Sequence, residues 1–112
     1  MNISEKQVDD VIVLDLQGSL MGGPEAVSLN DAINRFLDQN SLKLVINLSS
    51  VERVNSSGLG ILIKALTTFK TNGGELKLAH VNANLENLLA ITKLDSILES
   101  YDTEDAAVRS FL

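Results

Sequence analysis

The chain has 112 residues, 45% of them hydrophobic, which is enough for one buried core but too few for two domains of ordinary size. We therefore expect a single domain spanning residues 1–112. The absence of cysteine rules out disulfides and thiolate metal sites. With 15 acidic and 9 basic residues the formal charge is −6, and no cluster of Lys and Arg forms the basic surface that nucleic acids require.

Membrane insertion is also not expected. No stretch of the chain approaches the roughly 20 apolar residues of a membrane-spanning helix. The chain does not open on a charged segment followed by an apolar one, which is the pattern of a secretion signal. The expected location is therefore cytoplasmic.

The first third of the chain predicts a hairpin followed by a helix. Ile3 to Gln7 is predicted as a short strand, and Val11 to Gln17, which is rich in β-branched residues, as a second strand after the turn signal Asp9-Asp10. The pattern then breaks, and Pro24 suits the first position of a helix because its missing N–H has no partner there. Apolar residues at spacings of three and four extend this helix to about Asn40.

The rest of the chain predicts alternating strands and helices. Leu42 to Leu48 alternates as a strand with one much more polar face, and a helix with an apolar stripe runs from Ser56 to Thr71. The remaining predicted elements are a strand from Glu75 to Val81, a short helix capped within Asn82 to Asn84, a brief strand from Ile97 to Ser100 and a last helix capped by Asp102 or Thr103. The predicted fold class is α/β, with a mixed sheet of about five strands and four helices in the order ββαβαβαβα.

Chemistry is concentrated in Val54-Asn55-Ser56-Ser57-Gly58-Leu59-Gly60, which leads into the second helix. Asn55 is a good N-cap, and Ser56 and Ser57 follow on the first turn, where the helix dipole favours negative charge. A phosphate would be stabilised at this position. Gly58 and Gly60 are predicted to leave room for another surface to approach closely.

This segment resembles the hallmark of STAS domains, the family of bacterial anti-sigma factor antagonists. In that family a strand and loop lead to Asp-Ser-Ser/Thr-Gly-Leu-Gly and an apolar helix. The likeness covers nearly the whole chain, including a hairpin that ends in Leu16-Gln17-Gly18, a Gly73-Gly74 turn before a strand, and Leu88-Leu89 running into Thr92-Lys93-Leu94. The chain is therefore identified as a member of the STAS family, and the family's fold is expected.

The resemblance implies a partner switch. In antagonists the serine directly after the motif's Asp is phosphorylated by a partner that is both a serine protein kinase and an anti-sigma factor, and a serine phosphatase can reverse the modification. The matching position is Ser56, with Ser57 as second choice. The unmodified domain would bind the anti-sigma factor and the phosphorylated form would let go, since phosphate adds about −1.5 to −2 charges to the interface.

Two acidic features of the family pattern are missing. Asn55 replaces the usual Asp before the acceptor serine, and the loop after Gly18 contains Leu20 and Met21 where antagonists offer Glu or Asp. Leu20 and Met21 either form an exposed apolar patch beside the serine loop or fold back over the sheet. We predict a partner surface made of Leu20, Met21 and Asn55 to Gly60.

Two other functions stay open. The first is a constitutive scaffold or assembly subunit of a signalling or transport complex, in which Ser56 and Ser57 only cap a helix. The second is an enzyme, which the sequence supports least, because no nucleophile, base and orienting group can be assembled from it. His80 is the single histidine and is interpreted as a packed or edge-exposed residue, not a metal ligand. No catalytic residue, metal or cofactor is predicted.

Overall fold

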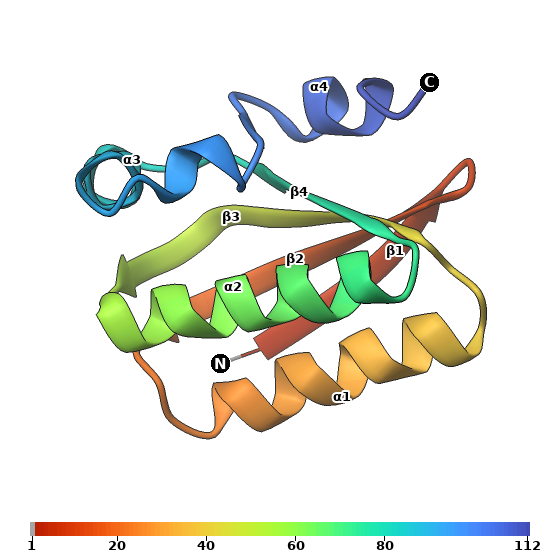
Figure 1. The fold of residues 1–112 in the computed structure, drawn as a ribbon, viewed down its shortest axis with the longest axis horizontal. Helices are drawn as coiled ribbons and strands as arrows, with labels where there is room; N and C mark the ends of the chain where they lie inside the picture. The colour runs from red at the N-terminus through yellow and green to blue at the C-terminus, as the bar shows by residue number, and fades with distance from the viewer. Residues whose placement is uncertain (1) are drawn as a thin grey trace.

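The computed structural model describes residues 2–112, and its elements follow the predicted order (Figure 1). Within this range there are five strands and four α-helices, with one short 3₁₀ helix added. In chain order the elements are β1 (Asn2–Val8), β2 (Val11–Leu20), α1 (Glu25–Asp38), β3 (Lys43–Val54), α2 (Ser56–Thr71), β4 (Glu75–Ala79), α3 (Ala83–Ile91), η1 (Leu94–Ser96), β5 (Ser100–Tyr101) and α4 (Glu104–Arg109). The predicted α/β class and the order ββαβαβαβα are confirmed.

One mixed sheet forms the centre of the molecule, with its strands in the spatial order β1-β2-β3-β4-β5. β1 pairs with β2 in antiparallel fashion across the turn at Asp9, so the predicted hairpin is confirmed. The pairs β2–β3, β3–β4 and β4–β5 are parallel. The carboxyl ends of parallel strands share one edge of a sheet, so the loops that lead into α1, α2 and α3 emerge together.

β2 and β3 run further than their hydrophobic patterns predict. β3 continues to Val54 instead of ending at Leu48, and β2 likewise continues to Leu20. The two extensions pair with each other across two register shifts, the second of which follows Gly18. A bulge interrupts the period-two alternation of a strand, which is why the sequence pattern ended too early.

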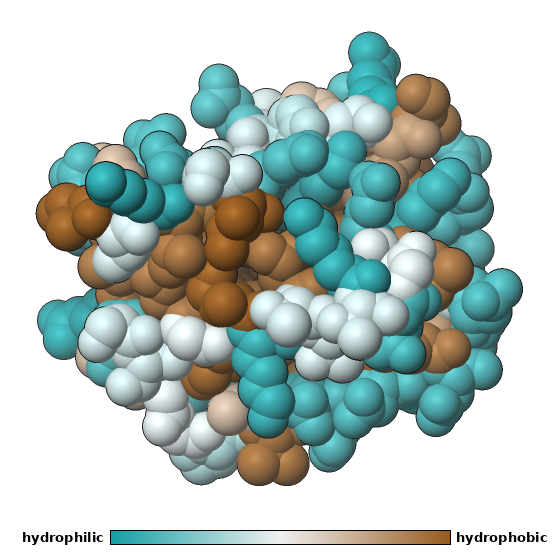
Figure 2. All heavy atoms as spheres, in the orientation of Figure 1, coloured by the Kyte–Doolittle hydropathy of each residue, from teal (hydrophilic) through white to brown (hydrophobic). Residues whose placement is uncertain are grey.

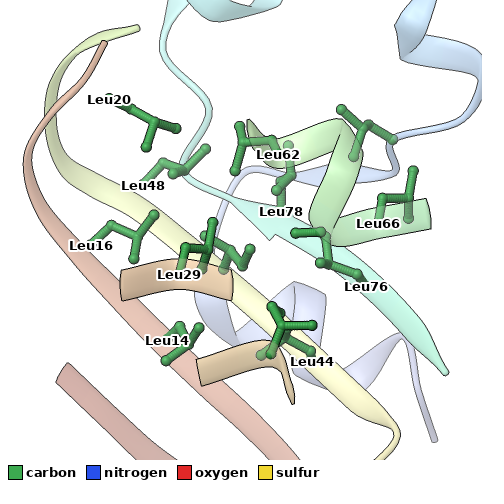
Figure 3. Packing of buried hydrophobic residues seen from close by; sticks show 14 of the residues in the cluster. Leu14, Leu16, Leu20, Leu29, Leu44, Leu48, Leu62, Leu66, Leu76 and Leu78 are labelled. Carbon is green, nitrogen blue, oxygen red and sulfur yellow. The ribbon is translucent and has the colours of Figure 1, made fainter. Parts of the chain in front are cut away.

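The main core lies between the sheet and the two long helices α1 and α2, which cover one face (Figure 1). Its largest members are Phe36 of α1 and Phe69 of α2, which are almost completely buried. Leucines from three strands and both helices fill the space between them (Figure 3). The labelled ones are Leu14, Leu16, Leu20, Leu29, Leu44, Leu48, Leu62, Leu66, Leu76 and Leu78.

The opposite face of the sheet is covered by α4. Val45 and Asn47 of β3 are both buried there, together with Ala107 and Val108 of α4. The buried Asn47 amide donates to the Glu104 carboxylate at 3.0 Å, and its oxygen accepts from a backbone N–H at 2.9 Å. The more polar face of this strand is therefore a second, smaller core in which the buried Asn47 amide is hydrogen-bonded.

The last strand differs from the prediction. Ile97 to Ser100 was expected to be extended, but the strand consists of Ser100 and Tyr101 and is preceded by η1. Leu98 is buried from an irregular segment, so its apolar character reflects packing and not strand periodicity. The final helix begins after Thr103, whose hydroxyl accepts from the Ala106 N–H at 3.0 Å.

Candidate functional site

Three loops meet where β2, β3 and β4 end, at the left side of Figure 1. Met21 of the β2–α1 loop, Arg53 and Val54 of β3, and Asn82 and Leu85 at the start of α3 line one groove of about 280 Å³ there. The serine motif begins directly after Val54. The topology therefore joins the predicted partner loops at one end of the molecule.

Asn55 is the N-cap of α2, as predicted. Its backbone is extended, and its side-chain oxygen accepts from the Gly58 N–H at 2.8 Å. Its side-chain nitrogen donates to the Met21 carbonyl at 3.1 Å. The amide thus connects the serine helix to the neighbouring loop, which a carboxylate could not do because it has no hydrogen to donate.

These two bonds of Asn55 can be separated by mutation. Asn55→Ala removes both, and we expect it to lower the free energy of unfolding by about 1 kcal/mol, the usual cost of losing an N-cap. Asn55→Asp restores the family residue and retains the cap but loses the bond to the Met21 carbonyl. In urea unfolding, Asn55→Asp should therefore lower the free energy of unfolding by less than Asn55→Ala does. Equal decreases in the two variants would contradict the assigned capping role.

Ser56 and Ser57 are the first two residues of α2, and both are exposed. Consecutive residues lie about 100° apart around a helix axis, so the two side chains face different directions. Ser57 faces the β2–α1 loop, because a Cβ added to Gly22 would lie 2.5 Å from the Ser57 Cβ. The predicted acceptor, Ser56, is accessible at the positive end of a long helix.

Gly58 has a different role from the predicted one. It is buried, and a Cβ added there would lie 1.8 Å from the carbonyl oxygen of Leu20. The close approach at Gly58 is therefore made by the chain's own β2 and not by a partner. Gly60 is exposed and an added Cβ would meet no atom within 4 Å, so the space predicted beside it is present.

Leu20 and Leu59 also do not fit direct partner contact, since both belong to the main core and are at most 3% exposed. Leu20 and Met21 were expected either to fold back over the sheet or to be exposed, and Leu20 folds back into the core. Exposure holds for Met21, whose side chain is 43% exposed. The accessible part of the predicted surface consists of Met21, Ser56, Ser57 and Gly60, with Asn55 partly accessible.

An apolar area extends this surface. Figure 2 shows it in the middle of the face that carries α2, with hydrophilic residues around it. The half-buried or exposed apolar side chains of α2 and of the segment from α3 to Ile97 include Ile63, Leu88, Leu94 and Ile97. Exposed apolar patches on small proteins commonly mark interaction sites.

Glu25, the first residue of α1, is a site residue that the sequence reasoning missed. Its carboxylate oxygen accepts from the N–H groups of Met21 at 2.7 Å and Gly22 at 2.9 Å. Hydrogen bonds from the backbone of Glu25 itself, Met21, Gly23 and Gly22 lower the pKa of this carboxyl to about 2. The β2–α1 loop is therefore bound by an acidic side chain, which comes from the first turn of α1. An acidic residue directly after Pro24 is the sequence feature from which this contact could have been predicted.

The low pKa of Glu25 makes a pH-dependent prediction. A carboxyl whose pKa falls from 4.5 when unfolded to about 2 when folded stabilises the fold fully above pH 4.5. This contribution is lost as the pH falls from about 4.5 to about 2. The Tm of the wild type should therefore be higher than the Tm of Glu25→Gln at pH 7. The difference between the two Tm values should become smaller as the pH falls from about 4.5 to about 2. A difference that does not change with pH would show that the carboxylate is not held as described.

The remaining candidates do not form a second site. His80 is half-buried at the end of β4, with a positive φ of 58°. Across residues 2–112, no group of three or more His, Cys, Asp or Glu side chains is arranged to hold a metal ion. In the same part of the chain, no helix is both long enough and apolar enough to cross a membrane.

The fold and the capped serine helix define an α/β domain with a five-stranded mixed sheet and an exposed pair of serines at a helix start. A family model described as the STAS domain matches residues 2–107. A candidate anti-sigma factor antagonist of Thermotoga maritima is 31% identical over 103 residues, which span 92% of this chain and 91% of the relative. The chain belongs to the STAS domain family, as predicted.

Solved structures agree with this membership. The crystal structure of the Thermotoga maritima protein superposes with a TM-score of 0.87 at 30% identity, covering 96% of this chain and 92% of the other. An anti-sigma factor antagonist from Mycobacterium paratuberculosis gives a TM-score of 0.82 at 26% identity, covering 97% and 92%. The unphosphorylated form of the antagonist SpoIIAA, at 16% identity and a TM-score of 0.76 over 98% and 97% of the chains, shares the fold.

Proposed function

We propose that the chain is an anti-sigma factor antagonist that binds an anti-sigma factor through the exposed part of its serine loop. The observation that carries the proposal is the accessible Ser56 at the start of α2, in a motif that matches the family's at the serine and glycine positions. Met21 and Gly60 provide an apolar contact and an open position beside it. Support also comes from the relatives, which carry the name of anti-sigma factor antagonist.

Phosphorylation of Ser56 is the proposed switch, with Ser57 as second choice. A phosphoserine at this exposed helix start is compatible with folding, because the dipole and the free N–H groups of the first turn favour negative charge. The same charge within a fitted interface is unfavourable unless the partner supplies a cation. The antagonist SpoIIAA, which shares the fold, has been solved in unphosphorylated and phosphorylated forms.

The proposed partners follow from this switch. They are an anti-sigma factor that is also a serine protein kinase, and a serine phosphatase that would reverse the modification. We propose no catalytic activity and no cofactor for the chain, and a cytoplasmic location in which residues 1–112 act as a single domain. The chemistry of the switch would then belong to the partner enzymes.

Incubation with a stoichiometric anti-sigma factor kinase, ATP and magnesium tests this proposal. Peptide mapping should find phosphate on Ser56 in the wild type, and Ser56→Ala should abolish it. Ser57→Ala is the matched control and should still be modified. The proposal fails if Ser56 remains unmodified while a known substrate of the same kinase is phosphorylated.

A constitutive scaffold subunit is the second candidate, and Asn55 favours it. The amide holds the β2–α1 loop at the Met21 carbonyl by a bond that the family's usual Asp could not make. The site is thus built for a fixed conformation and lacks one acid of the switching motif. A complex that forms equally well with Ser56→Asp and with wild type would support this function and exclude the switch.

A further inference from the structure

The segment from Leu20 to Pro24, here called the Met21 loop, is held from two sides. On one side the Glu25 carboxylate accepts from the N–H groups of Met21 and Gly22 at 2.7 and 2.9 Å. On the other side the Asn55 amide donates to the Met21 carbonyl at 3.1 Å, and the Asn55 N–H bonds to the Leu20 carbonyl at 3.4 Å. These contacts position the exposed Met21 side chain at the edge of the groove.

Ser57 contacts this loop directly. Gly22 has a φ of 88°, and a Cβ built on it would lie 2.5 Å from the Ser57 Cβ and 3.3 Å from the Ser57 hydroxyl oxygen. Gly22 and Ser57 are therefore too close for a side chain at position 22, while the Gly22 N–H donates to the Glu25 carboxylate. A group attached to the Ser57 oxygen would therefore be a close neighbour of the N–H groups that bind the carboxylate.

We propose that Glu25, Gly22 and Ser57 form a latch that reports the charge at position 57 to the Met21 loop. A neutral Ser57 leaves the carboxylate bound and Met21 in place. A negative charge on Ser57 repels the Glu25 carboxylate and weakens its hydrogen bonds to the N–H groups of Met21 and Gly22, so the loop is released. The inference rests on the proposed function in one respect, namely that Met21 belongs to the partner surface.

Phosphorylation is the modification that would operate the latch. A kinase would transfer the γ-phosphoryl group of ATP to the Ser57 oxygen, forming an O–P bond, breaking the bond to ADP and releasing the hydroxyl proton. Ser57 would then have a role separate from that of Ser56. Charge at Ser56 acts on the partner interface, whereas charge at Ser57 acts on the chain's own loop.

Two features make the mechanism specific to charge. The Glu25 carboxyl is ionised at neutral pH, since its pKa lies near 2, so a second anion meets a fixed negative charge. Two charged side chains, Glu52 and Arg53, line the same groove as Met21. The effect of charge at position 57 is therefore measured between side chains of equal size, because Ser57 lies close to Gly22 and a larger side chain would also disturb the loop.

Amide hydrogen exchange of Met21 and Gly22, measured by NMR on the full chain, tests the latch. Ser57→Asp should accelerate exchange of both amides by about tenfold or more relative to Ser57→Asn, which has the same size and no charge. In the Glu25→Gln background, Asp and Asn at position 57 should give equal exchange. Equal rates for Ser57→Asp and Ser57→Asn in the wild-type background would overturn the inference.

A variant of opposite sign keeps the test decisive if Ser57→Asp fails to fold. Ser57→Lys should slow the exchange of the Met21 and Gly22 amides relative to Ser57→Gln, because a cation strengthens the hold of the Glu25 carboxylate. Unchanged or faster exchange would overturn the latch. These measurements use neither kinase nor partner, so a negative result would leave the proposed function of Ser56 intact. A negative result in the Ser56 experiments would likewise leave the exchange measurements interpretable.

Discussion

Gly58→Ala is expected to lower the free energy of unfolding by about 3 kcal/mol. The new Cβ would lie 1.8 Å from the Leu20 carbonyl oxygen and 2.6 Å from its carbon, which are both backbone atoms of β2. Either α2 or the end of β2 must therefore move. The gain in helix propensity from glycine to alanine, about 1 kcal/mol, is too small to offset this displacement.

Gly60→Ala is the matched control, since Gly60 lies on the same helix and an added Cβ meets nothing within 4 Å. It should stabilise the protein by up to about 1 kcal/mol through helix propensity alone. In thermal unfolding the two variants should differ in Tm by roughly 10 °C or more. Similar stabilities would contradict the assignment of Gly58 to an internal contact.

Ser56→Asp is expected to weaken binding to the anti-sigma factor by about 30-fold or more, equivalent to about 2 kcal/mol. The substitution places a negative charge at an exposed position of the proposed interface. It should leave the fold intact, because acidic residues are favourable in the first turn of a helix. Isothermal titration calorimetry with the purified partner measures the change directly.

Ser56→Asn and Ser56→Ala separate charge from size in this measurement. Asn has nearly the same shape as Asp and no charge, so it should bind within a few-fold of wild type. Wild-type affinity in Ser56→Asp would remove the partner switch and favour the constitutive scaffold. A loss of the same size in Ser56→Asn would point to packing and not to charge.

The element order and the serine motif were predictable from sequence because local chemistry determines them. Asn55 caps α2 through its own side chain, and α2 begins at Ser56 and ends at Thr71 as its apolar spacing indicates. The hairpin turn at Asp9 also depends on adjacent residues. Such features need no knowledge of which distant segments meet.

The features that sequence did not predict depend on contacts between distant segments. The pairing of β2 with the end of β3 extends both strands through bulges that look like loop sequence. Gly58 is constrained by the Leu20 carbonyl, which belongs to another strand. The Glu25 carboxylate bridges residues only three and four positions away, but the loop conformation that presents their N–H groups arises from packing against α2.

Intact-mass spectrometry of the protein purified from its native host is the most direct test of phosphorylation at Ser56. Phosphorylation adds about 80 Da, and fragment mapping assigns the modified residue. We expect a phosphorylated fraction that carries phosphate on Ser56 and that changes between growth and stress. A protein that carries no phosphate under either condition would contradict the switch and leave constitutive binding as the function.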